Sequence, residues 1–170
     1  TPTLGQVKIL LEILFYIHST LSDSNEQRGN PEIYWTIENN ACGEGTLVAI
    51  QMTGLDNFPG DMVSDSTKRN GMNTNVRTKT TSCSVFKRLI EKGKMKLYSG
   101  PLISELKKFV SSGTSYAAKN GEHDDLVMAT LLIVRIYSIV SKWDDNIIQE
   151  DDVLSEMDEI TVEPMPFAIV

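Results

Sequence analysis

The most apolar stretch of the chain, residues 126–140 (LVMATLLIVRIYSIV), begins directly after His123, Asp124 and Asp125. Its apolar side chains fall on nearly all sides of a helix, so we expect a buried helix over residues 124–141. A soluble protein does not normally place acids next to such a segment. The start of this helix is therefore a candidate functional position.

A second acid stands in a similar context. Residues 32–37 (EIYWTI) are β-branched and aromatic, which is typical of a buried strand, and Glu38 follows them directly. Asparagines and glycines come next, and residues 44–55 have the pattern of a helix. The sequence thus predicts a strand, a turn and a helix, with Glu38 at the carboxyl end of the strand, where open α/β sheets bind ligands.

The rest of the chain alternates between predicted helices and short strands. We expect helices at residues 4–21, 79–92 and 101–110, and short strands at residues 61–64, 94–98 and 115–118. The length of 170 residues fits one domain, which we place at residues 1–142, followed by an acidic tail at residues 143–170. We expect the tail to be extended or disordered.

The net charge of −7 at first argues against a nucleic-acid partner, but the charge is unevenly distributed. Residues 143–170 carry nine acids and no base, whereas residues 66–100 carry nine bases and one acid. Such a basic segment is either a solvated helix face or a DNA-binding patch. The candidate DNA contacts are Lys68, Arg69, Arg77, Lys79, Lys87 and Arg88.

The cysteines and the hydropathy pattern argue against a zinc-binding protein, a membrane protein and a protein with a signal peptide. Cys42 and Cys83 form no CxxC pair, so we expect reduced thiols and no structural zinc site. We expect no transmembrane segment and no signal peptide, because no apolar run approaches the roughly 18–20 residues that span a bilayer.

The acids at the two sites have both ordinary and functional interpretations. Glu38 is either an exposed strand end or a ligand, and Asp124 or Asp125 is either a helix N-cap or a ligand. Taken together, they suit phosphodiester hydrolysis, in which carboxylates hold two Mg²⁺ (or Mn²⁺) ions about 3.5–4 Å apart. Mg²⁺ prefers such oxygen ligands.

Several segments resemble one known family. Residues 121–129 (GEHDDLVMA) are similar to the G-x-H-D-D-L-V-M-[AS] motif of the nuclease domain of the large terminase subunit of tailed phages, above all of large myoviruses. Residues 33–40 resemble the family strand that bears its second catalytic carboxylate, and the segments from residue 71 to 92 and at residues 109–118 follow the family pattern. The resemblance covers roughly residues 30–142.

The resemblance implies a fold and a set of site residues. The fold is RNase H-like (RuvC/integrase-like), an α/β mixed sheet flanked by helices. Glu38 matches the second carboxylate and the pair Asp124 and Asp125 matches the third. We favour Asp125 as the metal ligand, with Asp124 as a second ligand or an N-cap. His123 either orients a water or a carboxylate, or is a surface turn residue.

The first family carboxylate has no counterpart, so we expect the chain to lack the first strands of the fold and to expose a sheet edge beside residues 33–37. The Walker loop of the packaging ATPase is also absent from the sequence. A homodimer, or a partner strand, at that edge is the expected consequence.

The resemblance implies a metal-dependent endonuclease that cuts concatemeric viral DNA during packaging, in the cytoplasm of a phage-infected bacterium. Its expected partners are double-stranded DNA, the portal protein, the small terminase subunit and the terminase ATPase domain, with no membrane. We expect this chain alone to be weak or inactive. One alternative is a non-catalytic RNase H-like module that binds DNA or docks on the packaging motor. A Holliday-junction resolvase relative is another.

Overall fold

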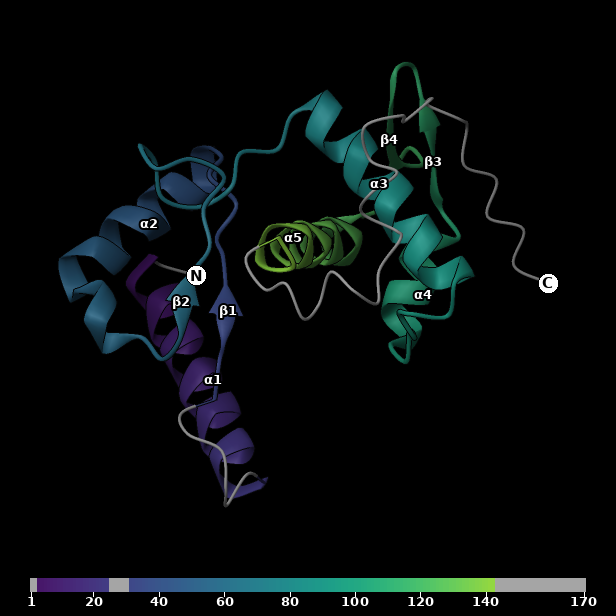
Figure 1. Ribbon diagram of the computed structural model, residues 1–170. Helices are drawn as coiled ribbons and strands as arrows, with labels where there is room; N and C mark the ends of the chain where they lie inside the picture. The colour runs from purple at the N-terminus through teal and green to yellow at the C-terminus, as the bar shows by residue number, and fades with distance from the viewer. Residues whose placement is uncertain (1–2, 25–30, 143–170) are drawn as a thin grey trace. The chain divides into compact units, whose positions relative to one another are not determined.

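The computed structural model describes residues 3–24 and 31–142, and the chain divides into two compact units after Thr74. The first unit contains α1 (Thr3–Ser24), β1 (Tyr34–Trp35), α2 (Ala41–Thr53), the 3-10 helix η1 (Leu55–Asn57) and β2 (Asp61–Met62) (Figure 1). The second contains α3 (Val76–Glu91), α4 (Gly100–Leu106), β3 (Phe109–Ser112), β4 (Ser115–Ala118) and α5 (Asp125–Val140). The acidic tail predicted at residues 143–170 lies outside the described residues.

The first unit is built on a strand–helix–strand motif. β1 and β2 are parallel, with Tyr34 opposite Asp61, and α2 is the crossover that parallel strands require. The pairing extends past the assigned strands, because the N–H of Asp61 donates to the carbonyl of Ile33 (2.7 Å) and the N–H of Val63 donates to that of Trp35 (2.8 Å). The predicted strand, turn and helix are confirmed, although β1 is shorter than expected.

Two helices supply the core of the first unit. α1 runs through the predicted residues 4–21 and packs beside α2. The rings of Trp35 and Phe58 lie 5.5 Å apart at their centroids. The buried apolar side chains of this cluster are Val7, Leu14, Ile33, Trp35, Ala49, Ile50 and Phe58. The strand that leads to Glu38 is therefore anchored by apolar residues of both helices.

α1 also corrects one expectation from the sequence. Its residues 3–23 are long and apolar enough to cross a membrane by length and composition alone, whereas we expected no such stretch. The difference arises because Lys8 and Glu12 interrupt the apolar run, while the mean hydropathy of the helix still reaches 1.2. In the structure one face of α1 carries buried Val7 and Leu14, while Ile13 and Tyr16 are exposed. The finding is weak evidence for a membrane, since core helices of soluble proteins and signal sequences pass the same test.

The start of α3 is set by a capping box. The Asn75 side chain accepts the N–H of Thr78 (2.9 Å), and the Thr78 hydroxyl accepts the N–H of Asn75 (2.9 Å). This reciprocal pair satisfies two helix N–H groups and begins the helix at Val76, before the predicted residue 79. The helix ends just before Gly93, whose φ of 70° favours glycine.

One predicted helix of the second unit is confirmed but too long, and one predicted strand is wrong. The predicted helix at residues 101–110 ends at Leu106, and Phe109 begins β3, which pairs in antiparallel fashion with β4. Residues 94–98, predicted as a strand, form none. The N–H groups of Lys94 and Met95 both donate to the carbonyl of Leu89 instead and close the end of α3. The strand predicted at residues 115–118 is confirmed as β4.

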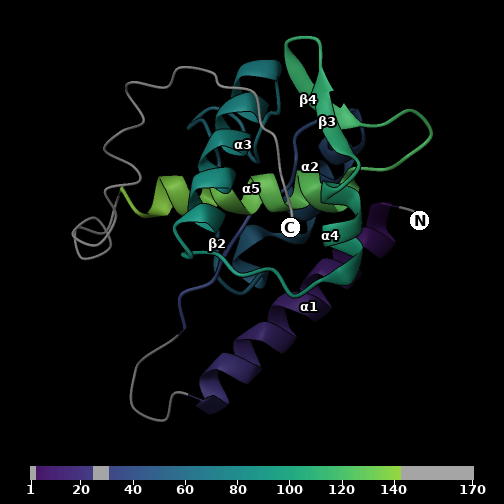
Figure 2. The ribbon, with the colours of Figure 1, turned by 90° about the vertical axis from the view of Figure 1, so that its right-hand side faces the viewer.

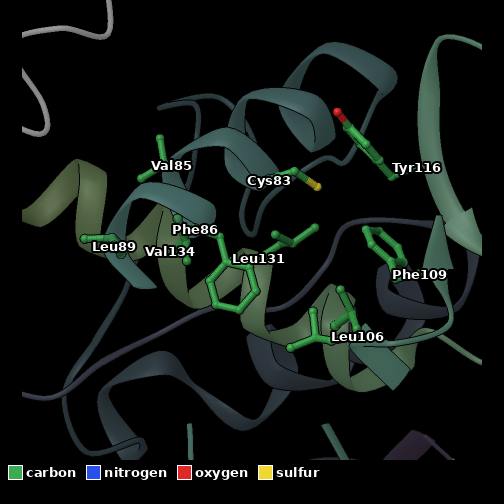
Figure 3. Packing of buried hydrophobic residues seen from close by; sticks show 10 residues of the cluster. Cys83, Val85, Phe86, Leu89, Leu106, Phe109, Tyr116, Leu131 and Val134 are labelled. Atoms are coloured by element: carbon green, nitrogen blue, oxygen red, sulfur yellow. The ribbon is translucent and has the colours of Figure 1, made fainter. Parts of the chain in front are cut away.

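The core of the second unit lies where α5 crosses α3, with α4 and the β3–β4 hairpin beside them (Figure 2). Figure 3 shows its buried side chains, among them Phe86 and Leu131. α5 buries only one face, through Val127, Thr130, Leu131 and Val134. Within the second unit, the expectation that it is buried nearly all round is not met, because this unit does not cover Ile133.

Cys83 is a free thiol in the middle of this core. Burial raises the pKa of the Cys83 thiol to about 12, although the positive charge of Lys79 acts in the opposite direction. The thiol therefore stays protonated at neutral pH, where only a thiolate would be a nucleophile or a metal ligand. Cys83 is thus a packing residue.

Candidate functional site

Glu38 lies where the extended chain after β1 ends. It forms an isolated parallel bridge with Met72, and the N–H of Asn39 donates to the carbonyl of Met72 (2.7 Å). Asn40 then fixes the carboxylate, because its Nδ2 donates to Oε2 of Glu38 (2.9 Å) while its Oδ1 accepts the N–H of Gly43 (2.9 Å). One side chain thus caps the first turn of α2 and orients the candidate ligand.

Gly43 lets α2 approach Glu38 closely. A Cβ atom built on Gly43 would lie 1.7 Å from the carbonyl oxygen of Glu38 and 3.4 Å from Cγ2 of Ile37. Since the first of these distances is far below any van der Waals contact, the backbone at Glu38 and the first turn of α2 can adopt their positions only with glycine at residue 43.

The second pair of predicted acids lies at the start of α5. Asp124 occupies the N-cap position, but its side chain makes no capping hydrogen bond. Instead Oδ2 of Asp124 pairs with Nζ of Lys79 at 3.4 Å, and the Lys79 ammonium lies 5.2 Å from the centroid of the Phe109 ring. The Lys79 side chain is 16% exposed, so this is a sheltered ion pair rather than a surface one.

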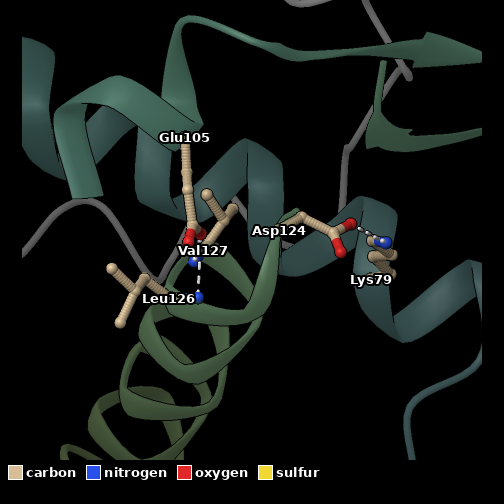
Figure 4. Close-up of polar contacts among 5 residues, drawn as sticks. All are labelled: Lys79, Glu105, Asp124, Leu126 and Val127. Atoms are coloured by element: carbon tan, nitrogen blue, oxygen red, sulfur yellow. Dashed lines mark hydrogen bonds and ion pairs between the residues drawn. The ribbon is translucent and has the colours of Figure 1, made fainter. Parts of the chain in front are cut away.

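Glu105 of α4 takes the hydrogen bonds that an N-cap side chain would usually accept. Its Oε2 accepts the N–H of Leu126 (2.8 Å) and of Val127 (3.2 Å), as Figure 4 shows together with the Asp124–Lys79 pair. The interpretation of Asp124 as a side-chain cap is therefore wrong.

His123 and Asp125 flank Asp124 and are both exposed. The Asp125 carboxylate makes no ion pair or side-chain hydrogen bond with another described residue, so it is accessible to a ligand from solvent. Asp124 and Asp125 differ in this respect, because the Asp124 carboxylate already faces a cation. The preference for Asp125 as the main metal ligand and the role of His123 stay predictions.

The carboxylate oxygens of Glu38, Asp124 and Asp125 are the kind of donor that Mg²⁺ or Mn²⁺ prefers. The structure brings His123, Asp124 and Asp125 together at one helix start, while Glu38 belongs to the first unit. Among residues 3–24 and 31–142, no three His, Cys, Asp or Glu side chains form a group that could hold a metal ion. A shared site of Glu38 with Asp124 and Asp125 stays a prediction, as does the packing of α5 against the strand at residues 33–37.

The six basic residues predicted to contact DNA lie in two different settings. Lys68 and Arg69 are exposed in the loop after β2, where they line a hollow with Asn39 and Asn70. The hollow is also lined by Asn39, the residue directly after Glu38, and by the carboxylate residue Glu44.

The other four basic residues lie on α3. Arg77 is exposed in the first turn and Arg88 is half-buried in the last. Lys87 pairs with Glu91 at 3.9 Å, and Lys79 pairs with Asp124. Because Lys79 already neutralises a carboxylate inside the unit, the structure favours Lys68, Arg69 and Arg77 as the residues presented to a phosphate.

Sequence reasoning missed three residues that support the site. Asn40 had a detectable signal, because an asparagine directly before a helix is a common N-cap. Gly43 and Glu105 had none, since neither the close approach to Glu38 nor the bond to α5 follows from their neighbours in the sequence. The bond of Glu105 to α5 joins two elements that meet only in the folded chain, and the close approach at Gly43 depends on the conformation of the turn between β1 and α2.

Comparison with known families identifies the class of this fold. A family model described as a terminase RNase H-like domain matches residues 21–135. The chain therefore belongs to the family of terminase RNase H-like domains, and the resemblance seen in the sequence is confirmed. The matched range includes Glu38, Asp124 and Asp125 together with all six basic residues.

Proposed function

We propose that this chain is the endonuclease module of a DNA-packaging terminase and cuts concatemeric viral DNA with the help of Mg²⁺ or Mn²⁺. One observation carries the proposal. In a chain of the terminase RNase H-like family, Glu38 stands at the carboxyl end of a parallel strand, with its carboxylate oriented by Asn40. That is the edge at which open α/β sheets place their ligands.

Glu38, Asp125 and Asp124 are the residues that would hold the metal. A bound divalent ion would lower the pKa of a coordinated water and stabilise the charge that develops on the phosphate. Asn40 holds the Glu38 carboxylate in a fixed orientation, and Glu105 and Lys79 define the surroundings of Asp124. Preorganised ligands of this kind lose little conformational freedom when the ion binds.

The proposed partners follow from the family and from one open strand edge. Double-stranded DNA is the substrate, and the ATPase domain, the small terminase subunit and the portal protein are the packaging partners in the host cytoplasm. Within the described residues, β1 has a partner strand on one side only, namely β2. We propose that the other edge receives the first strands of the family fold, which would bring the first carboxylate of the site, or the same edge of a second copy.

The second candidate function is a non-catalytic RNase H-like module that binds DNA or docks on the packaging motor. The observation in its favour is that the described part of the chain holds no group of three metal-binding side chains. A site with few carboxylates competes poorly with water for Mg²⁺.

Plasmid nicking in the presence of Mn²⁺ tests the proposal. We expect weak or no nicking by this chain, and clear nicking by a version extended upstream through the opening strand, because the extension supplies the first carboxylate of the family site. Glu38→Ala should abolish nicking by the extended version. Glu12→Ala, which removes an exposed glutamate of α1, is the matched control and should have no effect.

Three outcomes would contradict parts of this proposal. Equal nicking by the extended version with and without Glu38→Ala would remove Glu38 from the site. Comparable nicking by the short and the extended chains would show that the short chain already contains a complete site. An extended version that binds DNA but never nicks would favour the non-catalytic module.

DNA affinity tests the basic residues. The double substitution Lys68→Glu with Arg69→Glu should weaken binding to all DNA sequences alike, because contacts to phosphates carry no sequence information. The slope of the logarithm of the binding constant against that of the salt concentration should fall by about 2, or about 1 for each lost phosphate contact. The control is Lys107→Glu with Lys119→Glu, two exposed lysines of the second unit. An equal loss in this control would point to net charge rather than to a site.

A further inference from the structure

Two carboxylates compete for one role at the start of α5. The side chain of an N-cap residue usually accepts the N–H of the second or third helical residue, here Leu126 and Val127. Asp124 is one of the residue types preferred as an N-cap, and it occupies the N-cap position of α5. Both of these N–H groups nevertheless donate to Oε2 of Glu105, at 2.8 Å and 3.2 Å.

The backbone of Asp124 agrees with this division of roles. Its φ of −131° and ψ of 21° differ from the extended conformation that capping residues usually adopt. With this backbone, the Asp124 side chain turns away from the helix start and meets the ammonium of Lys79. Asp124 therefore presents its carboxylate to a cation, and Glu105 satisfies the helix.

Glu105 lies in α4, a different helix, at a position from which its side chain can cap α5. The next residue, Leu106, is buried in the core of the second unit and anchors the end of α4 beside α5. The Glu105 carboxylate brings a full negative charge to a helix N-terminus, where the two N–H groups and the helix dipole favour it. Removing it would leave both N–H groups without a side-chain acceptor other than Asp124.

We propose that Glu105 is a positioning residue of the nuclease site: it caps α5 in place of Asp124 and so leaves the Asp124 carboxylate turned toward Lys79, where a divalent cation would replace that ammonium as its partner. The inference rests on the proposed function, because that function makes Asp124 a metal ligand. Without Glu105, Asp124 turns back to cap its own helix. The helix then remains, but a ligand is lost.

A thermodynamic cycle tests the capping role without any metal. Glu105→Ala in the full chain should lower the folding equilibrium constant by less than the roughly five- to thirty-fold that the loss of a cap costs, because Asp124 takes over the cap but gives up its pair with Lys79. Asp124→Ala should then cost more in the Glu105→Ala background than in the wild type, because Asp124 caps only when Glu105 is gone. Additive effects, or no effect of Glu105→Ala, would overturn the inference.

Mn²⁺ affinity, measured from the EPR signal of the free ion, tests the positioning role. Glu105→Ala should weaken binding roughly tenfold, in the range seen when partners of metal ligands are removed. Glu105→Gln keeps an oxygen acceptor of the same shape and should restore most of the affinity. Glu91→Ala, at an exposed glutamate of α3, is the control. Wild-type affinity in a folded Glu105→Ala variant would overturn the positioning role.

Two further results separate this inference from the proposed function. If the wild-type chain binds no Mn²⁺, the proposed metal site is wrong, and the cycle still decides whether Glu105 caps α5. If Glu105→Ala does not fold, Glu105→Gln provides the test by NMR. The amide protons of Leu126 and Val127 should then shift upfield, since they lose a charged acceptor, while that of Val134 stays in place. Unshifted signals at Leu126 and Val127 would overturn the cap.

Discussion

Gly43→Ala is expected to lower the free energy of unfolding by about 3 kcal/mol, at the upper end of what overpacking usually costs. The added methyl group would lie 1.7 Å from the carbonyl oxygen of Glu38 and 2.9 Å from its carbonyl carbon. These are backbone atoms, so no side-chain rotation can relieve the clash. Either the first turn of α2 or the chain at Glu38 must move, and urea unfolding followed by circular dichroism measures the loss.

Gly45→Ala is the matched control in the same helix. Its Cβ would approach only atoms of the Thr3 side chain, at 3.8 Å and 3.9 Å, which is an ordinary contact. Because alanine favours a helix interior over glycine, this change should stabilise the chain by about 0.5–1 kcal/mol. In the extended version, Gly43→Ala should also abolish nicking and Gly45→Ala should not. Equal tolerance of both changes would contradict the close approach of α2 to Glu38.

Phe86→Ala is expected to destabilise the chain by about 3–5 kcal/mol, because it leaves a cavity in a core that packs at crystal-like density. Phe86 is 1% exposed and lies in the cluster that joins α3 to α5. Denaturant unfolding measures the loss, and hydrogen exchange should show faster exchange at Leu131 and Val134 of α5.

Tyr98→Ala is the control for Phe86→Ala, since Tyr98 is an aromatic residue of the same unit that is 87% exposed. Its replacement should change the stability by no more than about 0.5 kcal/mol, as is usual on the surface. If the two substitutions cost the same, Phe86 does not have the central place in the core that the structure assigns to it.

The elements that sequence analysis predicted correctly are those whose signals are local. The apolar periodicity at residues 4–21 and 126–140, and the β-branched run before Glu38, act over a few residues, so they predict α1, α5 and β1. The H-D-D-L-V-M motif predicted the family, and the match of residues 21–135 to the terminase RNase H-like domains confirms it.

The elements that sequence analysis missed depend on partners. Phe109 and Val110 continue a helical pattern in the sequence, but they pair with Ala118 and Ala117 in the hairpin. Residues 94–98 have the composition of a short strand, but their first N–H groups close the end of α3. In each case a hydrogen-bond partner elsewhere in the chain outweighed the local preference.

The sequence by itself determined which residues are candidates and where each one stands: Glu38 after a strand, and Asp124 and Asp125 at the start of a helix. These placements follow from short-range propensity and from the position of an acid beside an apolar segment. Only the tertiary structure decided what the acids do there. Asp124 forms an ion pair with Lys79, Glu105 caps α5, and Gly43 allows α2 to lie close to the backbone of Glu38. The first two contacts join residues 45 and 21 positions apart, so they form only when separate elements pack together.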